Sequence, residues 1–284
     1  MPKNAQWSEL FASPEERGSV KIRGVPNGTR IVVVSDCQIP LEDRALLGTV
    51  FGEFVRWFKP KTPGAEYHLF LNGDVIDNYT LSKFLDRALP TFHVGDEIKL
   101  TKKNLALWGR PFTHKHLVFG NHEDRWERYL WEGAPELAPY APSLATVLGL
   151  AELGFDWVPY LRHYDFEGFI ITHGDRTTKF VAKDMLELYH TAGTSGHVNR
   201  PQSYTYASAA NGEPITWYVT GMTCRTDIGD IIKQWRRIQP WQQAFLIGEV
   251  VDGVLHVELV RIHHGGFWAA GKMFRVKETD GTED

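Results

Sequence analysis

Three short apolar runs, each ending abruptly in a polar loop, are the feature that most restricts how this 284-residue chain folds. The first run, residues 31–34, reads Ile-Val-Val-Val and is β-branched and apolar on both faces. Such a run is typical of a central strand in a sheet that is covered on both sides. Residues 67–71 and 115–119 repeat the pattern, and helical patterns separate the three runs. Alternating strands and helices predict an α/β fold.

The helices can be bounded from residues that cap or break them. Asp43 is a good N-cap for a helix that carries apolar residues as far as Trp57 and is stopped by Pro60. A short apolar segment, 144–150, follows a stretch rich in proline and glycine. Further helices are predicted at three positions: 80–88, 96–108 and from Glu123 onward.

The second half of the chain is rich in strand patterns, and the last two strands are joined across Val251-Asp252-Gly253, a strong hairpin signal. Strands paired in this way, after strand–helix alternation, predict a four-layer α-β-β-α sandwich. Two mixed sheets would pack face to face, with the helices outside. We expect residues 1–28 to form a leader, 29–275 a single domain and 276–284 an acidic tail. The predicted later strands are 162–166, 169–172, 203–207, 215–219, 244–250 and 254–262.

Composition excludes several classes of protein. The net charge of −4 argues against a chain that works mainly by covering phosphates with positive charge. No apolar run approaches the roughly 18 residues that a membrane span needs, and the first residues lack the apolar block of a signal peptide. Two cysteines, Cys37 and Cys224, cannot make a disulfide framework. We therefore expect a cytoplasmic protein with no membrane partner. The oligomeric state is left open by the sequence.

Five polar loops hold the residue types that bind metals. In α/β sheets ligands gather at the carboxyl ends of strands, so these loops are expected to open onto one rim. Their carboxylate, carboxamide and imidazole side chains suit Mn²⁺, Fe²⁺, Zn²⁺ or Mg²⁺. The loops read Ser-Asp-Cys-Gln (35–38), Asn-Gly-Asp-Val-Ile-Asp-Asn (72–78), Gly-Asn-His-Glu-Asp (120–124), Thr-His-Gly-Asp (172–175) and Ser-Gly-His-Val-Asn-Arg (195–200).

In this order the loops resemble the motifs of the calcineurin-like metallophosphoesterases: D-x-H, G-D-x-x-D, G-N-H-(D/E), a lone His, and G-H-x-H. The resemblance spans roughly residues 31–200, and the strand-rich remainder to about residue 262 fits the second sheet of that family. One G-D-x-x-D motif alone would be weak. Several motifs in the expected order, each after a strand, are specific. The chain is most similar in style to small bacterial or bacteriophage members, which would place it in the host cytoplasm if it comes from a phage.

The resemblance implies two adjacent metal sites that share Asp74. One site adds three residues that match the family pattern: Asn121, His173 and His197. The other site would take Asp36, with Gln38 and Asn199 standing where the pattern has histidines. Ligands that are all oxygen favour Mn²⁺ or Mg²⁺ over Zn²⁺, so Mn²⁺ is the expected cofactor. The alternative is that this second site has been lost, which would leave a mononuclear or inactive protein.

The resemblance also implies the reaction: hydrolysis of a phosphomonoester or phosphodiester by a hydroxide that bridges the two ions. His122 would protonate the departing oxygen or hold the phosphate, and Asp77 would orient His122 through a hydrogen bond. Asn121 lies beside it and would also meet the substrate. Arg125 and Arg200 flank two of the loops and are expected either to contact phosphate or to be ordinary surface arginines.

The sequence gives one indication of the substrate. Residues 225–241 mix cations with tryptophans, a combination that suits stacking on bases, and Tyr204 and Tyr206 lie nearby in the sequence. The other interpretation is an amphipathic helix whose tryptophans pack inward. Nucleotides or nucleic acid are the first prediction, and a protein or small-metabolite phosphatase and a binding or scaffold module without activity are the alternatives. The residues of this segment that carry the pattern are Arg225, Lys233, Trp235, Arg236, Arg237 and Trp241.

Four histidines lie in or beside predicted strands without any metal-binding motif around them: His68, His114, His116 and His256. Their surroundings in the sequence predict ordinary core or surface histidines.

Overall fold

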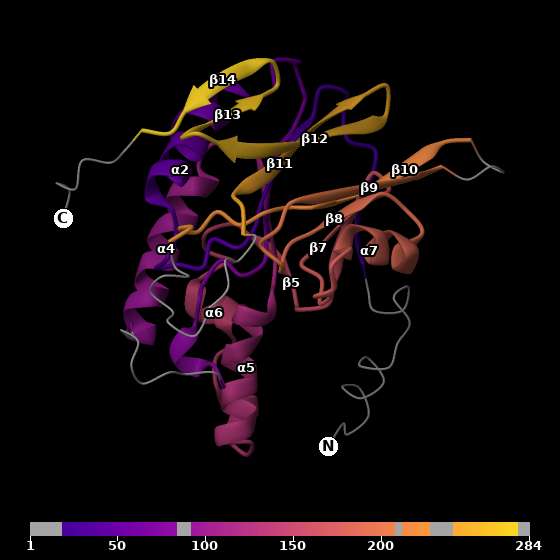
Figure 1. The fold of residues 1–284 in the computed structure, drawn as a ribbon. Helices are drawn as coiled ribbons and strands as arrows, with labels where there is room; N and C mark the ends of the chain where they lie inside the picture. Colours follow the sequence, from indigo (N-terminus) through magenta and orange to yellow (C-terminus); the bar gives the residue numbers. More distant parts are fainter. Residues whose placement is uncertain (1–18, 84–91, 208–211, 228–240, 278–284) are drawn as a thin grey trace.

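The computed structural model describes residues 19–83, 92–207, 212–227 and 241–277. The chain forms two sheets that face one another, with helices on their outer faces (Figure 1). The predicted four-layer α-β-β-α sandwich is therefore confirmed. The helices α2, α4 and α6 cover one sheet, and α7 covers the other (Figure 1).

The first sheet has eight strands in the order β14-β13-β12-β11-β2-β3-β4-β5. The strands β2 to β5 run parallel, and the remaining four are added through antiparallel pairs. The predicted hairpin is present, because β11 and β12 pair along their whole length, as far as Val251 opposite Val254. The bounds are β2 (Arg30–Val34), β3 (Tyr67–Asn72), β4 (His114–Val118), β5 (Asp156–Val158), β11 (Ala244–Val251), β12 (Val254–His263), β13 (Gly266–Ala269) and β14 (Lys272–Arg275).

The second sheet has six strands in the order β1-β6-β7-β8-β10-β9. Its edge strand β1 lies within residues 1–28, so the predicted leader contributes a strand that pairs in parallel with β6. The strands β7, β8 and β10 are also mutually parallel. The bounds are β1 (Val20–Ile22), β6 (His163–Phe166), β7 (Phe169–Thr172), β8 (Gly193–Ser195), β9 (Gln202–Ala207) and β10 (Pro214–Val219).

The helices largely follow the predicted positions. Asp43 caps α2 as expected, since its Oδ1 accepts the backbone N–H of Leu46 at 2.9 Å. α2, η1 and α3 together cover the predicted helix that ends at Trp57. Of the helix predicted over 80–88, the described part is the short turn η2, and residues 84–88 lie outside the described residues. The bounds are α2 (Arg44–Thr49), η1 (Val50–Phe54), α3 (Val55–Trp57), η2 (Tyr79–Leu81), α4 (Val94–Gly109), α5 (Asn121–Gly133), η3 (Ala138–Tyr140), α6 (Leu144–Leu148) and α7 (Val181–Tyr189).

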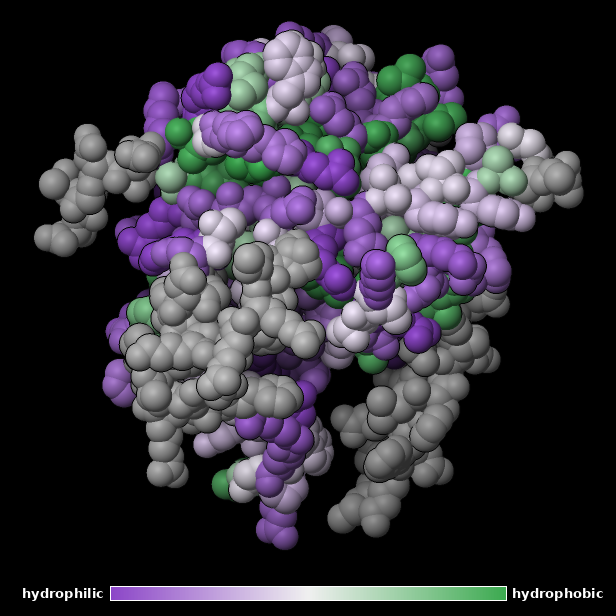
Figure 2. Space-filling view, in the orientation of Figure 1, coloured by the Kyte–Doolittle hydropathy of each residue, from purple (hydrophilic) through white to green (hydrophobic). Residues whose placement is uncertain are grey.

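Three apolar clusters fill the three spaces between the four layers. Along β2, Val32 and Val34 belong to the cluster beneath the first helices, whereas Ile31 and Val33 belong to the cluster between the sheets. This alternation is what a strand covered on both faces requires. A third cluster, which includes Trp217, lies between the second sheet and α7. Outside these layers the face seen in Figure 2 is mostly hydrophilic, with hydrophobic residues in small groups.

The fold brings the five polar loops together. The loops after β2, β3 and β4 leave the same end of the first sheet because these strands are parallel. The loops after β7 and β8 leave one end of the second sheet for the same reason. In the described part of the chain, no helix is both long and apolar enough to cross a membrane.

Candidate functional site

Asp74 lies at the centre of the rim, in the loop after β3. Its Oδ1 is 3.3 Å from Nε2 of His173, which follows β7 in the other sheet. His197, after β8, completes a group in which one ligand atom from each residue lies within 4.8 Å of the others. Asp74 and His173 are almost fully buried, with 2% and 0% of their surface exposed. Three of the predicted metal ligands are thus brought together from three loops.

Asp36 borders this group from the loop after β2. Its Oδ2 accepts the backbone N–H of His197 at 3.2 Å, and the hydroxyl of Ser35 donates to the same oxygen. A Cβ placed on Gly196 would lie 2.7 Å from Asp36 Oδ2 and 3.2 Å from His173 Nδ1, so both side chains lie against the same glycine. The predicted ligands of the two proposed ion sites are therefore neighbours.

Five of the seven predicted ligands have a buried polar atom with no hydrogen-bond partner among the described residues. Buried polar atoms are nearly always hydrogen-bonded, and each unpartnered one costs about 1–3 kcal/mol. Divalent cations would satisfy all of these oxygen and nitrogen atoms, so the residues present fit the metal centre that the fold implies. The atoms are Asp36 Oδ1, Asn121 Oδ1, His173 Nε2, His197 Nδ1 and Asn199 Oδ1.

The backbone at the predicted ligands is strained. Non-glycine residues rarely adopt a positive φ, and such conformations concentrate at functional sites. Five of the seven predicted ligands have one, so the loops hold these side chains at an energetic cost that packing elsewhere must offset. The φ values are 53° for Asp36, 49° for Gln38, 51° for Asp74, 73° for His197 and 55° for Asn199.

Two glycines allow the loops to approach one another closely. A Cβ on Gly73 would lie 2.3 Å from Nδ1 of His173, and a Cβ on Gly120 would lie 2.2 Å from Oδ1 of Asp74. Both distances are far below van der Waals contact, so neither position accepts a side chain without displacing a predicted ligand. The sequence expectation that glycines let backbone pass close to the site holds at these positions.

The buried carboxylate of Glu123 supports the loop that carries Asp74. Its Oε2 accepts the backbone N–H groups of Asp74 at 2.9 Å and Gly120 at 2.8 Å. Its Oε1 accepts that of Val75 at 2.7 Å. Glu123 therefore ties the loop after β3 to the first turn of α5. The sequence marked this residue within a motif but gave it no role.

α5 begins at Asn121, two residues before the predicted start, and presents its first N–H groups to the rim. The backbone N–H of His122 donates to Asp74 Oδ1 at 3.0 Å. The helix N-terminus thus already holds one negative group, in keeping with its preference for anions.

His122 is fixed by two neighbours. Its Nδ1 lies 3.0 Å from Asp77 Oδ1, the contact that the family resemblance implied. Arg125 lies 2.8 Å from His122 Nε2 and donates to the backbone oxygen of Asp77 at 2.6 Å. An arginine can only donate, so Nε2 accepts and the ring carries its proton on Nδ1, facing Asp77. Arg125 is only 12% exposed and is a built part of the site rather than an ordinary surface arginine.

Two further residues support His122 from a distance in the sequence. Asn78 donates from Nδ2 to the backbone oxygen of His122 at 3.1 Å. The backbone N–H of Asn78 in turn donates to Oε2 of Glu97, a buried carboxylate on α4, at 2.8 Å. Burial raises the pKa of Glu97 to about 7. No local motif marks Glu97, because it reaches the site only through the packing of α4.

Charge and burial shape the protonation of the cluster. Burial raises the pKa of Asp74, but the imidazoles of His122 and His173 outweigh it and hold that pKa below its usual value. Burial would lower the pKa of His173, yet Asp74 raises it to about 10. Burial and the nearby His173 lower the pKa of His197 to about 4. Burial raises the pKa of Asp36 to about 7. A carboxylate that burial disfavours in this way gains from a nearby cation.

The two residues that depart from the family pattern differ in their contacts. Gln38 Oε1 accepts a weak hydrogen bond from Cys224 Sγ at 3.7 Å, so this oxygen already has a partner. Asn199 is 8% exposed and its Oδ1 has none among the residues that the structure describes.

The remaining predicted substrate contacts lie further out. Arg200 donates to the backbone oxygen of Thr178 at 3.0 Å, which anchors it to the loop after β7. Arg225 pairs with Asp227 on the surface. Tyr206, on the edge strand β9, is 50% exposed. Lys233, Trp235, Arg236 and Arg237, which carried the indication of base stacking, lie outside the described residues.

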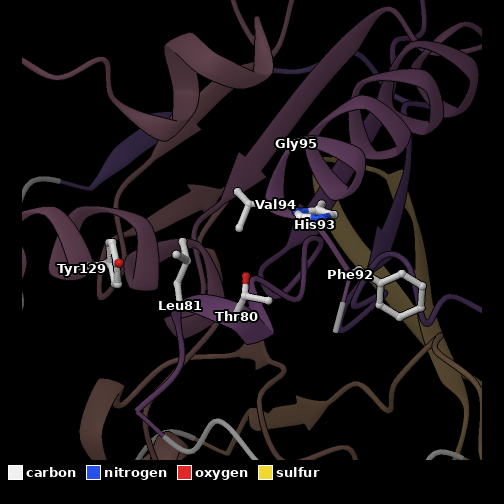
Figure 3. Close-up of a pocket in the computed structure, with 7 residues that line it drawn as sticks. All are labelled: Thr80, Leu81, Phe92, His93, Val94, Gly95 and Tyr129. Atoms are coloured by element: carbon white, nitrogen blue, oxygen red, sulfur yellow. The ribbon is translucent and has the colours of Figure 1, made fainter. Parts of the chain in front are cut away.

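A hollow of about 430 Å³ lies between η2, the start of α4 and the middle of α5 (Figure 3). η2 directly follows Asn78, and Tyr129 is seven residues beyond His122 on α5, about 10 Å along the helix axis. Aromatic rings and small apolar groups dominate its walls. The lining residues are Thr80, Leu81, Phe92, His93, Val94, Gly95 and Tyr129.

A four-layer sandwich that gathers carboxylate, carboxamide and imidazole side chains at the rim of both sheets defines the class of the metallophosphoesterases. The family model described as calcineurin-like phosphoesterase matches residues 29–208, which is more than half of the chain. The protein belongs to this family. The resemblance drawn from its motifs is thereby confirmed.

Two curated relatives come from mycobacteriophages, in keeping with the expected phage-type member. The gene 54 protein of Mycobacterium phage L5 is 27% identical over 267 residues, which cover 87% of this chain and 99% of the phage protein. The gene 54 protein of Mycobacterium phage D29 is 27% identical over 268 residues, with the same coverage.

Similar solved structures are more distant. Vps29 from Entamoeba histolytica, complexed with zinc, matches with a TM-score of 0.40 and 10% identity over 87% of this chain and 98% of its own. A cold-active protein tyrosine phosphatase matches with a TM-score of 0.38 and 12% identity over 84% of this chain and 81% of its own.

Proposed function

We propose that this protein is a metal-dependent phosphoesterase that hydrolyses phosphomonoesters or phosphodiesters with two divalent cations at the rim. The observation that carries the proposal is the set of five buried, unpartnered ligand atoms described above. A protein that never bound cations there would leave these atoms unsatisfied, at a combined cost of several kcal/mol. The strained backbone at the same residues points in the same direction.

The proposed ligands divide into two sets that share Asp74. One set adds Asn121, His173 and His197 and offers both nitrogen and oxygen. The other adds Asp36, Gln38 and Asn199 and offers only oxygen, which favours Mn²⁺ or Mg²⁺. When bound, such ions lower the pKa of water and offset the negative charge that develops on the phosphoryl oxygens.

His122 is proposed to supply the proton that the leaving oxygen needs. Burial lowers its pKa, but Asp74 and Asp77 outweigh burial and raise that pKa above its usual value, so the ring can hold a proton near neutral pH. Asp77 keeps the ring oriented through Nδ1, and Nε2 lies 3.5 Å from Asp74 Oδ2. Nε2 accepts from Arg125 in this structure, so we propose that Arg125 turns to the phosphate when substrate binds and frees Nε2 to carry the proton. Asn121, one residue earlier on α5, would contact the substrate from the same helix turn.

Arg125 is proposed to bind a phosphate oxygen. Its guanidinium lies beside His122 Nε2 and is held by Asp77, so it presents several donors to one place at little entropic cost. Arg200, on the loop after β8, is proposed as a second, more peripheral contact.

Nucleotides or nucleic acid are the proposed substrates. The hollow in Figure 3 supports this choice, because Phe92 and Tyr129 line a space that would accept a flat ring, and Tyr129 lies on the same helix as His122. The exposed Tyr206 on β9 offers a further stacking surface.

The test is hydrolysis with added Mn²⁺, compared across p-nitrophenyl phosphate, its bis(p-nitrophenyl) ester and a nucleoside 5′-(p-nitrophenyl phosphate). We expect turnover that Asp74→Asn reduces at least a hundredfold, because the shared ligand is weakened. Asp252→Asn is the matched control, since Asp252 lies in the β11–β12 hairpin at the opposite end of the sheet. Turnover that Mn²⁺ fails to raise above the Asp74→Asn level would overturn the proposal. A preference for phosphopeptides or sugar phosphates would replace the nucleotide assignment.

A second candidate function is a binding or scaffold module that holds one ion or none. The observation that favours it is the hydrogen bond between Gln38 and Cys224, which occupies the oxygen that the second ion would need. Metal counting separates the two functions. Two Mn²⁺ ions per chain with turnover support the enzyme, whereas one ion without turnover supports the module.

The phage relatives support a location in the cytoplasm of the infected bacterium. Both relatives span nearly the whole of this chain, so the comparison does not rest on a shared fragment. Fractionation of infected cells, followed by detection of the tagged protein, would test the location.

A further inference from the structure

A second group of metal-ligand side chains lies at the opposite end of β3 and β4. His68 on β3 and His114 on β4 are direct neighbours in the sheet register, and Glu66 immediately precedes β3. Glu66 Oε2 lies 2.8 Å from His68 Nε2 and 3.7 Å from His114 Nε2. One ligand atom from each residue lies within 4.8 Å of the others. The separations approach those between the ligands of a tetrahedral ion.

We propose that Glu66, His68 and His114 form a second metal site that binds Zn²⁺. Two imidazoles and one carboxylate, with a fourth position open to water, are a ligand set that Zn²⁺ favours. β3 has six residues, so this site lies about 20 Å from the rim where Asp74 sits. It is therefore separate from the proposed phosphoesterase centre and does not depend on it.

The surroundings hold His68 in a fixed orientation. Its Nδ1 lies 3.1 Å from Nε2 of His116, which is 4% exposed. The ring of Phe166, from the second sheet, meets the His68 ring edge-on at 5.0 Å, and the His114 ring stacks on it at 4.5 Å. Metal-bound histidines almost always hydrogen-bond through their other ring nitrogen, which fixes the ring and its tautomer. His116 supplies that partner here.

The hydrogen-bond pattern leaves one buried nitrogen without a partner, and an ion would change its protonation. With no ion, His68 donates from Nε2 to Glu66 and accepts from His116 Nε2, so His116 Nδ1 carries no proton. This buried nitrogen indeed has no hydrogen-bond partner in the described chain. With an ion on His68 Nε2, the proton of His68 lies on Nδ1 and that of His116 on its own Nδ1. The latter nitrogen then faces Asp156 Oδ2 at 3.9 Å, and no proton is gained or lost.

The site is accessible and its buried ligand is neutral. Burial lowers the pKa of His68 to about 4, so the ring is neutral at neutral pH and needs only the change of tautomer described above to present Nε2 to an ion. The side chains of Glu66 and His114 are 33% and 45% exposed, which gives the ion a route from solvent. A bound ion would clamp the starts of β3 and β4 together, and binding to the folded chain alone would stabilise it.

The test uses the full chain in an Asp74→Asn background, so that the rim contributes little metal binding. Zn²⁺ affinity is measured by calorimetry, and Co²⁺ is used as a coloured substitute whose visible bands report a tetrahedral site. We expect His114→Ala to weaken Zn²⁺ binding at least tenfold and to remove the Co²⁺ bands. His256→Ala is the matched control, because His256 is an exposed histidine on β12 that belongs to neither metal-ligand group found among the described residues. The proposal would be overturned if the His114→Ala and His256→Ala variants bound Zn²⁺ with equal affinity and gave equal Co²⁺ bands. It would also be overturned if Zn²⁺ bound weakly and Glu66→Gln left that affinity unchanged.

Thermal unfolding distinguishes loss of the metal site from a folding defect. At a hundredfold excess over the dissociation constant of the His256→Ala chain, Zn²⁺ should raise the melting temperature of that chain by about 5 °C and that of the His114→Ala chain by at most about half as much. Both chains should melt alike without metal, since His114 is half exposed. In the natural Asp74 background, His114→Ala should keep phosphoesterase turnover, so failure of this site and failure of the proposed enzyme give different results.

Discussion

The two ends of β3 both gather carboxylates and imidazoles, but they do so in different ways. At the carboxyl end the candidate ligands come from five loops, and five of them sit on a left-handed backbone. At the amino end Glu66, His68 and His114 lie on or beside regular strands, and none of them has a positive φ. The carboxyl end leaves its buried ligand atoms unpartnered, whereas at the amino end Glu66 and His68 already pair with each other.

This difference indicates different roles for the two ends. Strain and unsatisfied atoms reduce stability, so they persist only where the rest of the fold compensates and function requires them. The carboxyl end therefore has the properties of a reaction site. The amino end has the properties of a stabilising clip, because its ligands need no unusual backbone and its rings stack in a compact layer.

The largest expected effect follows from closing the space at the carboxyl end. Gly120→Ala would place a methyl group 2.2 Å from Asp74 Oδ1 and 2.8 Å from His173 Nε2, so both side chains must move. We expect phosphoesterase turnover to fall by about a hundredfold or more, the loss typical of misplacing reacting groups by an ångström. The steady-state rate of hydrolysis of the nucleoside 5′-(p-nitrophenyl phosphate) measures this loss.

Gly133→Ala is the control, since a Cβ at Gly133 meets nothing within 4 Å. Zn²⁺ binding by the amino-end site should be the same in both variants. If Gly120→Ala retained full turnover, the tight packing around Asp74 would have no part in the reaction.

The next effect concerns the amino end and its response to pH. Burial lowers the pKa of His116 to about 3, whereas an unfolded histidine titrates near pH 6.5. The unfolded chain therefore binds the proton first, and the stability present above about pH 6.5 is lost as the pH falls toward 3. Between pH 7 and pH 4.5, protonation of His116 in the unfolded chain should lower the free energy of unfolding by about 2.5 kcal/mol. We expect His116→Phe to abolish this part of the decrease. Urea denaturation at each pH measures this slope.

The phenylalanine fits the site because His116 already packs against Phe70 and Tyr164. His256→Gln, on an exposed strand position, should keep the pH slope of the natural chain. An unchanged slope in His116→Phe would mean that His116 titrates normally and that the buried histidine layer does not couple folding to pH.

The smallest expected effect tests the half of the rim that lacks histidines. Gln38→His would replace a carbonyl oxygen that Cys224 already engages with an imidazole nitrogen. We expect about a tenfold tighter retention of metal and a shift toward Zn²⁺, since nitrogen ligands suit softer ions. The affinities for Mn²⁺ and Zn²⁺, each measured by competition with a chelator, report both changes.

Asp252→His, in the β11–β12 hairpin at the opposite end of the sheet, controls for the added imidazole. Metal content that stays the same in Gln38→His would count against Gln38 as a ligand and would favour the mononuclear alternative.

The fold could be predicted where the sequence carries its own boundaries. The runs that became β2, β3 and β4 supply buried apolar residues to the clusters on both sides of the sheet, and Asp43 marks the start of α2. α7 was missed because its N-cap is Phe180, whose side chain makes no capping hydrogen bond. β1 was missed because three residues of mixed polarity become a strand only by pairing with β6, far along the chain.

The same reasoning explains which site residues could be predicted. The candidate ligands at the rim lie in short motifs with fixed spacing, so their order alone pointed to a common site. Glu97 and the anchoring of Arg125 depend on how α4 and α5 pack, which no local pattern reports. The group formed by Glu66, His68 and His114 depends on strand register, and a one-residue slip would send its members to opposite faces.

The carboxylate of Glu123 gives the rim a mechanical property. Because it accepts N–H groups from both the loop after β3 and the first turn of α5, these two segments are held as one rigid bracket. Any tilt of α5, for instance when a ring enters the hollow beside Tyr129, would be transmitted directly to Asp74 and His122 together. Occupancy of that hollow would thus shift Asp74 and His122 as one unit and preserve the distance between them.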